Sequence, residues 1–254
     1  MKKLKTVFGI LLSAYLIMAG LLFIYQGNLL YHPSVEISHT FHTQKFTHDN
    51  ETLNVIVINA GMDNAIIYFG GNAEAVVGNA IHFFRAFSDQ TVYLTNYRGF
   101  GGSTGVPKEA ALYKDAEYIF DKVSSQHQKV SIIGRSLGTG VATFVASSRE
   151  VDKLVLVTPY DSILHIAQDQ FPIFPLSILL THQFNSVDRV NNIKAQTLVI
   201  LAENDLVIPE KYSTELIKAF PVDQVKVETI ANSNHNNLVS KDKYLSLLSR
   251  FLHN

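Results

Sequence analysis

One serine in the middle of the chain has the setting of an enzymatic nucleophile. Ser136 lies in the stretch VSIIGRSLGTGVATFVAS, two residues after Gly134 and two residues before Gly138. The β-branched run before it predicts a short buried strand, and the small residues after it predict a helix that packs closely on a sheet. A sharp strand-to-helix turn exposes a serine Oγ, and flanking glycines relieve crowding there. Because the G-x-S-x-G string alone arises by accident in roughly one chain in ten of this size, the prediction depends on this context.

A nucleophilic serine needs a base, and the predicted base is His235. This histidine lies in a polar loop, ANSNHNNLVS, between the last predicted strand and the C-terminal helix. A doubly wound sheet presents such loops at the carboxyl ends of its strands. We expect ordinary surface or core roles for most other histidines, and no metal site, because no carboxylate-rich surroundings accompany the early group. These other histidines are His32, His39, His42, His48, His82 and His127.

The base in turn needs an orienting acid, and Asp205 is the predicted acid. It follows the apolar run TLVILAE directly and precedes Pro209 at a helix start, although an ordinary helix-entry turn residue is an alternative interpretation. Glu203 and Asp161 are weaker candidates. Glu203 is close in sequence, but its side chain should point in another direction than that of Asp205 at the strand end. Asp161 opens the cap segment and would simply end the strand before it.

Acyl transfer also needs hydrogen-bond donors for the developing oxyanion, worth about 3 kcal/mol each. FGGN ends the strand predicted at 64–71 and enters a helix, so we assign the oxyanion hole to the backbone N–H groups of Asn72 and Leu137. A simple glycine turn is the alternative for FGGN. A second glycine loop, NYRGFGGSTG, has Thr104 where the G-x-G-x-x-G pattern needs glycine, so we expect a scaffold loop rather than a dinucleotide site.

These residues must be positioned by an α/β fold. Short apolar runs alternate with longer helical segments, which predicts a mainly parallel, doubly wound sheet. A polar alternating run at 41–50 predicts an added antiparallel edge strand. Prolines interrupt apolar helical pieces at about 160–190, where we expect a small helical cap over the sheet. The predicted strands of the core are 52–59, 64–71, 91–97, 129–134, 153–159, 197–203 and 224–230.

Composition limits the classes of partner. The 254 residues carry a formal charge of −1, and only 17% of them are charged, so no nucleic-acid partner is expected. The absence of cysteine excludes a thiol nucleophile, disulfides and cysteine-bound zinc.

The first 27 residues predict a membrane anchor. Three lysines, Lys2, Lys3 and Lys5, precede an uncharged stretch long enough to span a hydrocarbon core of about 30 Å. A cleaved signal sequence is the alternative, although its apolar region is usually shorter. Lysines favour the cytoplasmic side, so we expect the catalytic domain, residues 28–254, on the extracytoplasmic side, and secreted or periplasmic if the segment is cleaved.

Several stretches together resemble a known family. FGGNAE, NYRGFGGSTG, GRSLGTG, TPYDSI, AENDLVIP and NSNHNNL, in this order, look like the membrane-anchored α/β-hydrolase-domain proteins related to monoglyceride lipases and protein depalmitoylases. The resemblance covers nearly the whole chain and implies the α/β-hydrolase fold. It also implies a cofactor-independent serine hydrolase in which Ser136 attacks, His235 moves the proton and Asp205 holds the imidazole. Gly70 departs from the pattern, because many relatives carry a histidine there that supports the oxyanion loop.

The resemblance implies cleavage of carboxylic ester or thioester bonds through an acyl-enzyme. A serine peptidase or amidase of the same fold is an alternative, as is a membrane-anchored binding protein without turnover. We expect lipid or other acyl substrates at the membrane, because the cap segment is apolar enough to line an acyl pocket. The cap residues suited to that role are Ile163, Ile166, Phe171, Ile173, Phe174 and Leu176.

Overall fold

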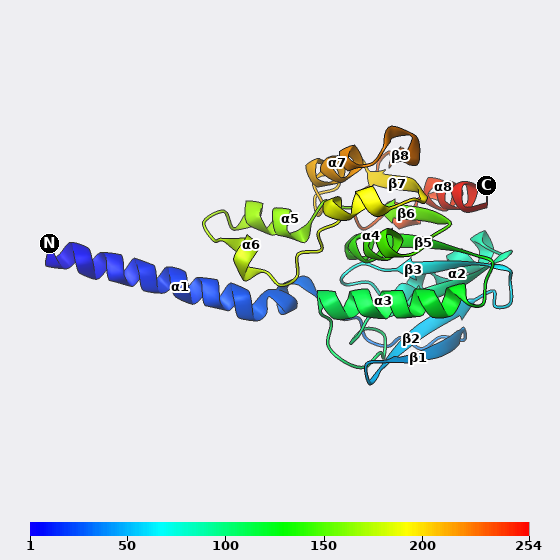
Figure 1. Cartoon of the computed structure of the whole chain (residues 1–254), viewed down its shortest axis with the longest axis horizontal. Coiled ribbons are helices and arrows are strands. Elements are labelled where there is room, and N and C mark those ends of the chain that lie inside the picture. The colour runs from blue at the N-terminus through cyan, green and yellow to red at the C-terminus, as the bar shows by residue number, and fades with distance from the viewer. Residues whose placement is uncertain (254) are drawn as a thin grey trace.

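An eight-stranded sheet forms the centre of the structure, a computed structural model that describes residues 1–253 (Figure 1). The strand order is β1-β2-β4-β3-β5-β6-β7-β8. The β1–β2 and β2–β4 pairs are antiparallel, and the remaining pairs are parallel. The strands are β1 His42–His48, β2 Glu51–Ile58, β3 Asn64–Phe69, β4 Gln90–Thr95, β5 Lys129–Arg135, β6 Lys153–Val157, β7 Gln196–Ala202 and β8 Val225–Ile230.

The predicted mainly parallel sheet and its antiparallel edge strand are confirmed, with one difference. The strand β2 is itself antiparallel to β4, and β4 lies between β2 and β3 although β2 and β3 are neighbours in the sequence. Five residues connect β2 to β3, and Asn59 and Gly61 in this connection both have positive φ angles. The chain therefore reverses direction there and leaves room for β4 to enter.

Helices cover both faces of the sheet. On β3, Ile67 and Phe69 face a core shared with α3, α4 and α7, whereas Ile66 and Tyr68 face a core shared with α2 and α8. This alternation follows from the two-residue period of a strand and buries both faces. The helices are α1 Lys2–Leu30, α2 Ala80–Ala86, α3 Glu109–Ser124, α4 Leu137–Ser148, α5 Ile163–Gln170, α6 Leu176–Leu179, α7 Glu210–Ala219 and α8 Asp242–His253. Short 3₁₀ segments are η1 Val76–Asn79, η2 Val187–Asn192, η3 Val222–Gln224 and η4 Leu238–Ser240.

The register of the parallel strands brings their carboxyl ends to one edge of the sheet. Phe69 at the end of β3 pairs with Gly134 of β5, and the next residue, Arg135, pairs with Val157 at the end of β6. The loops that follow these strands therefore start side by side, where ligands of open α/β sheets bind.

The helix α1 projects away from the sheet, and its last turns pack on the segment between β6 and β7 (Figure 1). It is long and apolar enough to cross a membrane, with a mean hydropathy of 2.5, and it continues three residues past the predicted boundary at residue 27. The segment between β6 and β7 contains α5, α6 and η2 at the positions predicted for the cap. The surface of this segment next to α1 is apolar, with a small cluster of Leu22, Phe174 and Leu176.

Candidate active site

Ser136 occupies a strained turn between β5 and α4. Its φ and ψ angles are 50° and −119°, a conformation that a residue with a Cβ rarely adopts. The Ser136 N–H donates to the carbonyl of Val157, 2.9 Å away, which ties the turn to β6. A Cβ on Gly138 would lie 2.0 Å from the Phe69 carbonyl oxygen, and one on Gly134 would lie 2.5 Å from the Gly138 carbonyl oxygen. The close approach of α4 to the strand ends therefore requires both glycines, as the sequence predicted.

The structure brings Ser136, His235 and Asp205 together from three loops. His235 Nε2 lies 2.9 Å from Ser136 Oγ, and His235 Nδ1 lies 2.8 Å from Asp205 Oδ2. An ionised carboxylate only accepts hydrogen bonds, so Nδ1 carries the ring proton and Nε2 is free to accept the serine proton. Ser136 and His235 are buried, and the side chains of His235 and Asp205 are only 8% and 7% exposed.

The other oxygen of Asp205 and the loop around His235 fix this geometry. Asp205 Oδ1 accepts the N–H groups of Val207 and Ile208, at 2.9 and 2.8 Å. The His235 loop is closed by Asn234, whose side chain accepts two backbone N–H groups at 3.0 Å each. Both groups are therefore held before any substrate arrives.

The two weaker acid candidates lie elsewhere. Glu203 accepts the Asn232 N–H at 2.7 Å and so supports the start of the His235 loop. Asp161 pairs with His165, 2.5 Å away, and accepts the Ser162 N–H at 2.7 Å, which fixes the start of α5. Neither carboxylate is bonded to His235.

The loop after β3 and the first residue of α4, which carry the predicted oxyanion donors, both lie next to Ser136. A Cβ on Gly71 would lie 3.6 Å from the Ser136 Cβ, so the loop after β3 passes directly over the serine. Leu137 is the first residue of α4, where a backbone N–H has no acceptor within its own helix. The positive end of the α4 dipole also points at this position.

An ion pair that no sequence motif predicted supports the oxyanion loop. Glu74 Oε2 accepts the Gly71 N–H at 2.8 Å and lies 2.9 Å from Arg135 Nη1. The other carboxylate oxygen accepts from Tyr68 and Asn79, at 2.7 and 2.6 Å. A Cβ on Gly70 would lie 2.8 Å from a Val76 methyl group and 3.2 Å from Glu74 Oε2. The glycine that departs from the family pattern therefore leaves space for Glu74, which supports the loop.

Arg135 links this carboxylate to the histidine loop. Its Nη2 donates to the carbonyl of His235 at 3.1 Å, so one guanidinium contacts both sides of Ser136. Burial disfavours ionisation of Glu74, but Arg135 and the three hydrogen-bond donors outweigh burial, and the pKa of the carboxyl lies below its usual value. Glu74 lies in the motif FGGNAE and Arg135 in the motif GRSLGTG. The charge of Arg135, next to Ser136 at the end of an apolar strand, is the sequence signal that indicates a role for this residue in the site.

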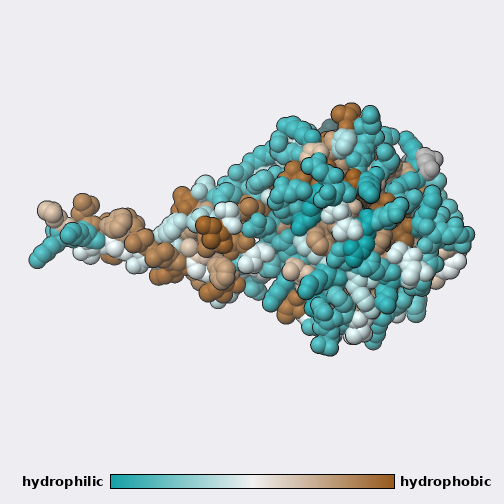
Figure 2. Space-filling view, viewed as in Figure 1, coloured by the Kyte–Doolittle hydropathy of each residue, from teal (hydrophilic) through white to brown (hydrophobic). Residues whose placement is uncertain are grey.

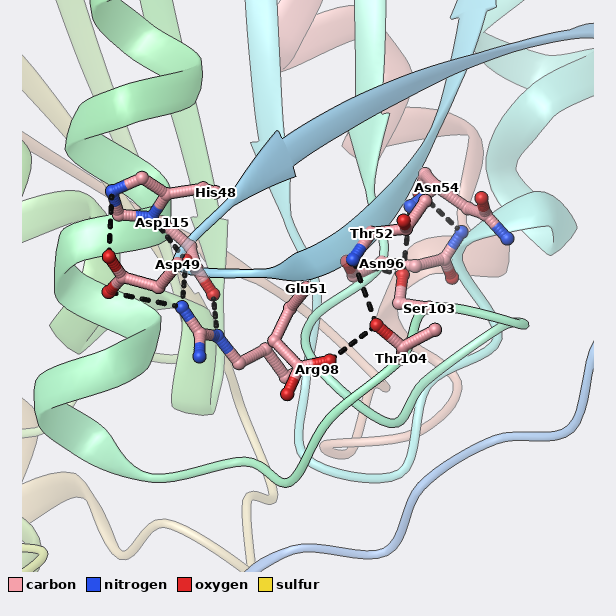
Figure 3. A network of polar contacts seen from close by, with 10 residues as sticks. All are labelled: His48, Asp49, Glu51, Thr52, Asn54, Asn96, Arg98, Ser103, Thr104 and Asp115. Carbon is pink, nitrogen blue, oxygen red and sulfur yellow. Dashed lines mark hydrogen bonds and ion pairs between the residues drawn. The ribbon is translucent and has the colours of Figure 1, made fainter.

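The second glycine loop is tied to the β1–β2 hairpin and α3, as expected of a scaffold (Figure 3). Arg98 forms two hydrogen bonds with Asp115, at 2.6 and 2.7 Å, and His48 Nδ1 lies 2.8 Å from the same carboxylate. Ser103 accepts the Asn54 N–H at 2.9 Å (Figure 3). Tyr97, from the same loop, donates to the Gly70 carbonyl at 2.9 Å, so the scaffold reaches the oxyanion loop.

The end of α1 is bonded directly to the oxyanion loop. The Asn72 side chain donates to the Leu30 carbonyl at 2.9 Å, and the His32 N–H donates to the Asn72 carbonyl at 2.9 Å. A further hydrogen bond joins α1 to the cap, since Gln26 Oε1 accepts the Thr181 N–H at 2.7 Å. The end of α1 and the residues just after it are thus part of the framework around Ser136.

An apolar cavity of about 170 Å³ lies between α1 and the cap. For comparison, an engineered cavity of about 150 Å³ with an aliphatic lining holds a benzene molecule. Gln26, Gln170 and His182 contribute the polar atoms of its wall. The apolar lining comes from Leu22, Leu29 and Leu30 of α1 and from Ile163, Ile166 and Leu176 of the cap, with Ala167, Phe171 and Leu180 completing it.

Comparisons with known proteins agree with this fold. The α/β hydrolase fold family matches residues 64–179. The Pyrococcus furiosus esterase Pf2001 superposes with a TM-score of 0.68 at 18% identity, covering 88% of this chain and 98% of the esterase. The chain therefore has the α/β hydrolase fold.

The chain is also similar to an uncharacterized membrane protein of Saccharomyces cerevisiae, 28% identical over 179 residues, which cover 67% of this chain and 63% of the relative. An uncharacterized Mycobacterium tuberculosis protein is 29% identical over 203 residues, which cover 76% of this chain and 70% of the relative. The lysophosphatidylserine lipase ABHD12 of Bos taurus is 33% identical over 174 residues, which cover 59% of this chain and 44% of the lipase. The chain thus spans less than half of the length of that lipase.

Proposed function

We propose that the protein is a serine hydrolase that cleaves carboxylic ester or thioester bonds of acyl substrates at a membrane. The observation that carries this proposal is the continuous contact from Asp205 through His235 to Ser136, at 2.8 and 2.9 Å. This arrangement of acid, base and hydroxyl activates a serine for attack on a carbonyl carbon.

The reaction follows from these contacts. Ser136 Oγ attacks the acyl carbon while its proton moves to His235 Nε2, and Asp205 stabilises the imidazolium through Nδ1–H. The carbonyl oxygen takes up the negative charge between the N–H groups of Asn72 and Leu137. The bond to the leaving oxygen or sulfur then breaks, and that atom receives the proton from Nε2. Water repeats the sequence on the acyl-enzyme and releases the carboxylic acid.

The cavity between α1 and the cap supports a substrate with an apolar acyl chain. Its wall is predominantly apolar, and Leu30 contributes both to this wall and, through its carbonyl, to the hydrogen bond with Asn72. A chain in this cavity would therefore lie next to the oxyanion loop. The lipase relative acts on lysophosphatidylserine by its name, and an acyl chain with a polar headgroup is the substrate class we infer for this chain.

The three N-terminal lysines orient the protein in the membrane. Lys2, Lys3 and Lys5 favour the cytoplasmic side, so the sheet domain would lie on the extracytoplasmic side. The substrate would then come from the outer leaflet of that membrane.

A panel of acyl esters of rising chain length, run beside peptide amides, tests the proposal. We expect ester hydrolysis by the wild-type protein, with kcat/KM rising with chain length, and no comparable amide cleavage. The Ser136→Ala variant is the matched control, and its turnover should fall on the order of 10⁴- to 10⁶-fold. Preferred cleavage of amides would favour a peptidase, and the absence of any turnover would favour a binding protein.

A further inference from the structure

The tip of the cap exposes apolar side chains beside α1. We call residues 171–180, FPIFPLSILL, the cap loop; it contains no charged residue. Ile173 and Ile178 are 70% and 81% exposed. Exposure of such side chains to water is unfavourable relative to burial. In Figure 2 the hydrophobic surface of α1 continues onto the part of the molecule where α1 joins it, whereas the sheet domain is largely hydrophilic on this face.

The contacts between the cap loop and α1 set the depth of the loop. Tyr15 stacks on Phe174, with ring centroids 4.9 Å apart, and its hydroxyl donates to the Ile173 carbonyl at 3.0 Å. At about 1.5 Å per residue, a hydrocarbon core of about 30 Å that begins after Lys5 ends near Tyr25. Tyr15 then lies about 15 Å inside the outer edge of that core. The part of the cap loop that touches Tyr15 lies at the same depth.

The carbonyl groups of the cap loop lie close to donors within the protein, as a lipid environment favours. The carbonyl oxygens of residues 171–174 all lie within hydrogen-bond distance of a side-chain donor. Gln168 Nε2, which has two hydrogens to donate, lies 3.4, 3.5 and 3.0 Å from the oxygens of Phe171, Pro172 and Phe174, and the Tyr15 hydroxyl donates to that of Ile173. Gln26 and Gln183 donate to further carbonyls in and beside α6. A loop in water needs no such partners, whereas an unpaired carbonyl in hydrocarbon costs several kcal/mol.

The opposite side of the cap has the polar character of a surface in water. Asp169, the only acidic residue of α5, is bonded to Lys211 and to the Tyr212 hydroxyl on α7, the latter at 2.8 Å. The charged contact thus faces the sheet domain, and the uncharged cap loop extends along α1.

We infer that the cap loop is inserted into the hydrocarbon layer of the extracytoplasmic leaflet together with α1. This inference rests on the proposed membrane span of α1. Its consequence is that the cavity between α1 and the cap is reached from the lipid rather than from water. An acyl chain would then enter sideways from the leaflet while its headgroup stays at the membrane surface.

Single-cysteine variants test this insertion, because the natural chain contains no cysteine. We would attach an environment-sensitive NBD fluorophore at Ile173→Cys or Ile178→Cys in the full chain, reconstituted in phosphatidylcholine vesicles. Ile17→Cys on α1 reports the membrane span, and Val222→Cys, at a site 89% exposed on the sheet domain, is the control in water. Quenching is then compared between nitroxide-labelled lipids and aqueous iodide.

We expect lipid nitroxides to quench the labels at positions 173 and 178 at least half as strongly as the label at position 17. The label at 173 should respond more to a deep nitroxide, and the label at 178 more to a shallow one, because the loop rises from Tyr15 towards Gln26. Iodide should quench only the label at 222. Quenching of 173 and 178 by iodide alone, with 17 still quenched by lipid, would overturn the insertion and leave the span intact. Loss of lipid quenching at 17 as well would refute the span and the insertion together.

Discussion

At the scale of single residues, the account depends on which carboxylate serves His235. Asp205→Asn preserves the shape of the side chain but presents an amide to the imidazole, which favours the wrong tautomer. By analogy with the serine-protease example, kcat should fall by about 10⁴-fold. Glu203→Gln and Asp161→Asn are matched controls, because neither carboxylate is bonded to His235, and their kcat values should change far less. A large loss of kcat in Asp161→Asn, together with full activity in Asp205→Asn, would show that Asp161 and not Asp205 is the acid.

The role of Glu74 follows from the structure and was not predicted from the sequence. Glu74→Gln keeps the size of the side chain but removes the charge that pairs with Arg135, so the oxyanion loop should shift. A displacement of about 1 Å in such a loop costs about 10²-fold in rate, and we expect that loss in kcat with little change in KM. The comparison with Glu74→Ala should show a larger loss, because the hydrogen bond to Gly71 also disappears. A Glu74→Gln variant with wild-type kcat would remove this residue from the positioning of the site.

The same pair predicts a pH dependence of stability. The folded-state pKa of Glu74 is lowered, so its stabilisation is fully present above the unfolded-state pKa, about 4.3, and is lost as the pH falls through the folded-state value. Breaking a buried pair costs about 3 kcal/mol. The difference in free energy of unfolding between wild type and Glu74→Gln should be near this value at pH 7 and shrink below about pH 4.3. Urea titrations at several pH values measure it, and a constant difference across this range would contradict the lowered pKa.

The sequence predicted some of these residues for a physical reason. Ser136 lies in a local motif whose glycines are demanded by its own turn, and Asp205 and His235 each follow a strand at the edge where parallel strands end. Glu74 and Arg135 are 61 residues apart in the sequence, and their pairing depends on the adjacency of β3 and β5. No local sequence pattern indicates that β3 and β5 are neighbours, so the ion pair could not be predicted without the fold.

At the scale of elements, α1 and the oxyanion loop are joined through Asn72. Asn72→Ala removes the side-chain bond to the Leu30 carbonyl but keeps the backbone N–H that we assign to the oxyanion hole. We expect kcat on a water-soluble short-chain ester to fall about tenfold, because the loop loses one of its supports. Asn191→Ala, at an exposed asparagine near the end of η2, is the control and should leave kcat unchanged. Equal kcat values for Asn72→Ala and wild type would show that α1 does not support the loop.

The features that the sequence did not predict are contacts between elements that lie far apart in the chain. The strands were found by their apolar runs, but the antiparallel pairing of β2 with β4 depends on a tight reversal at Asn59 and Gly61. The α1 helix was recognised from its uniform apolar composition. That same uniformity hides which face of α1 meets protein, so its contacts through Gln26 and Tyr15 were not predicted.

At the scale of the whole molecule, the account places the sheet domain outside the cytoplasm. The exposed position 222 allows a direct test in a bacterial host. A Val222→Cys variant should react with a membrane-impermeant maleimide in intact spheroplasts, to the same extent as after lysis. Cysteine placed at Lys3, on the other side of α1, should react only after lysis. The reversed pattern would put the sheet domain in the cytoplasm.

The central claim is that Ser136 is the nucleophile of a serine hydrolase. The most direct measurement treats the full-length protein with a fluorophosphonate and locates the adduct by peptide mass spectrometry. We predict one phosphonylated residue, Ser136, with adduct formation abolished in Ser136→Ala and slowed strongly in His235→Ala. An adduct absent from wild type, or present on another residue and retained in Ser136→Ala, would contradict the account.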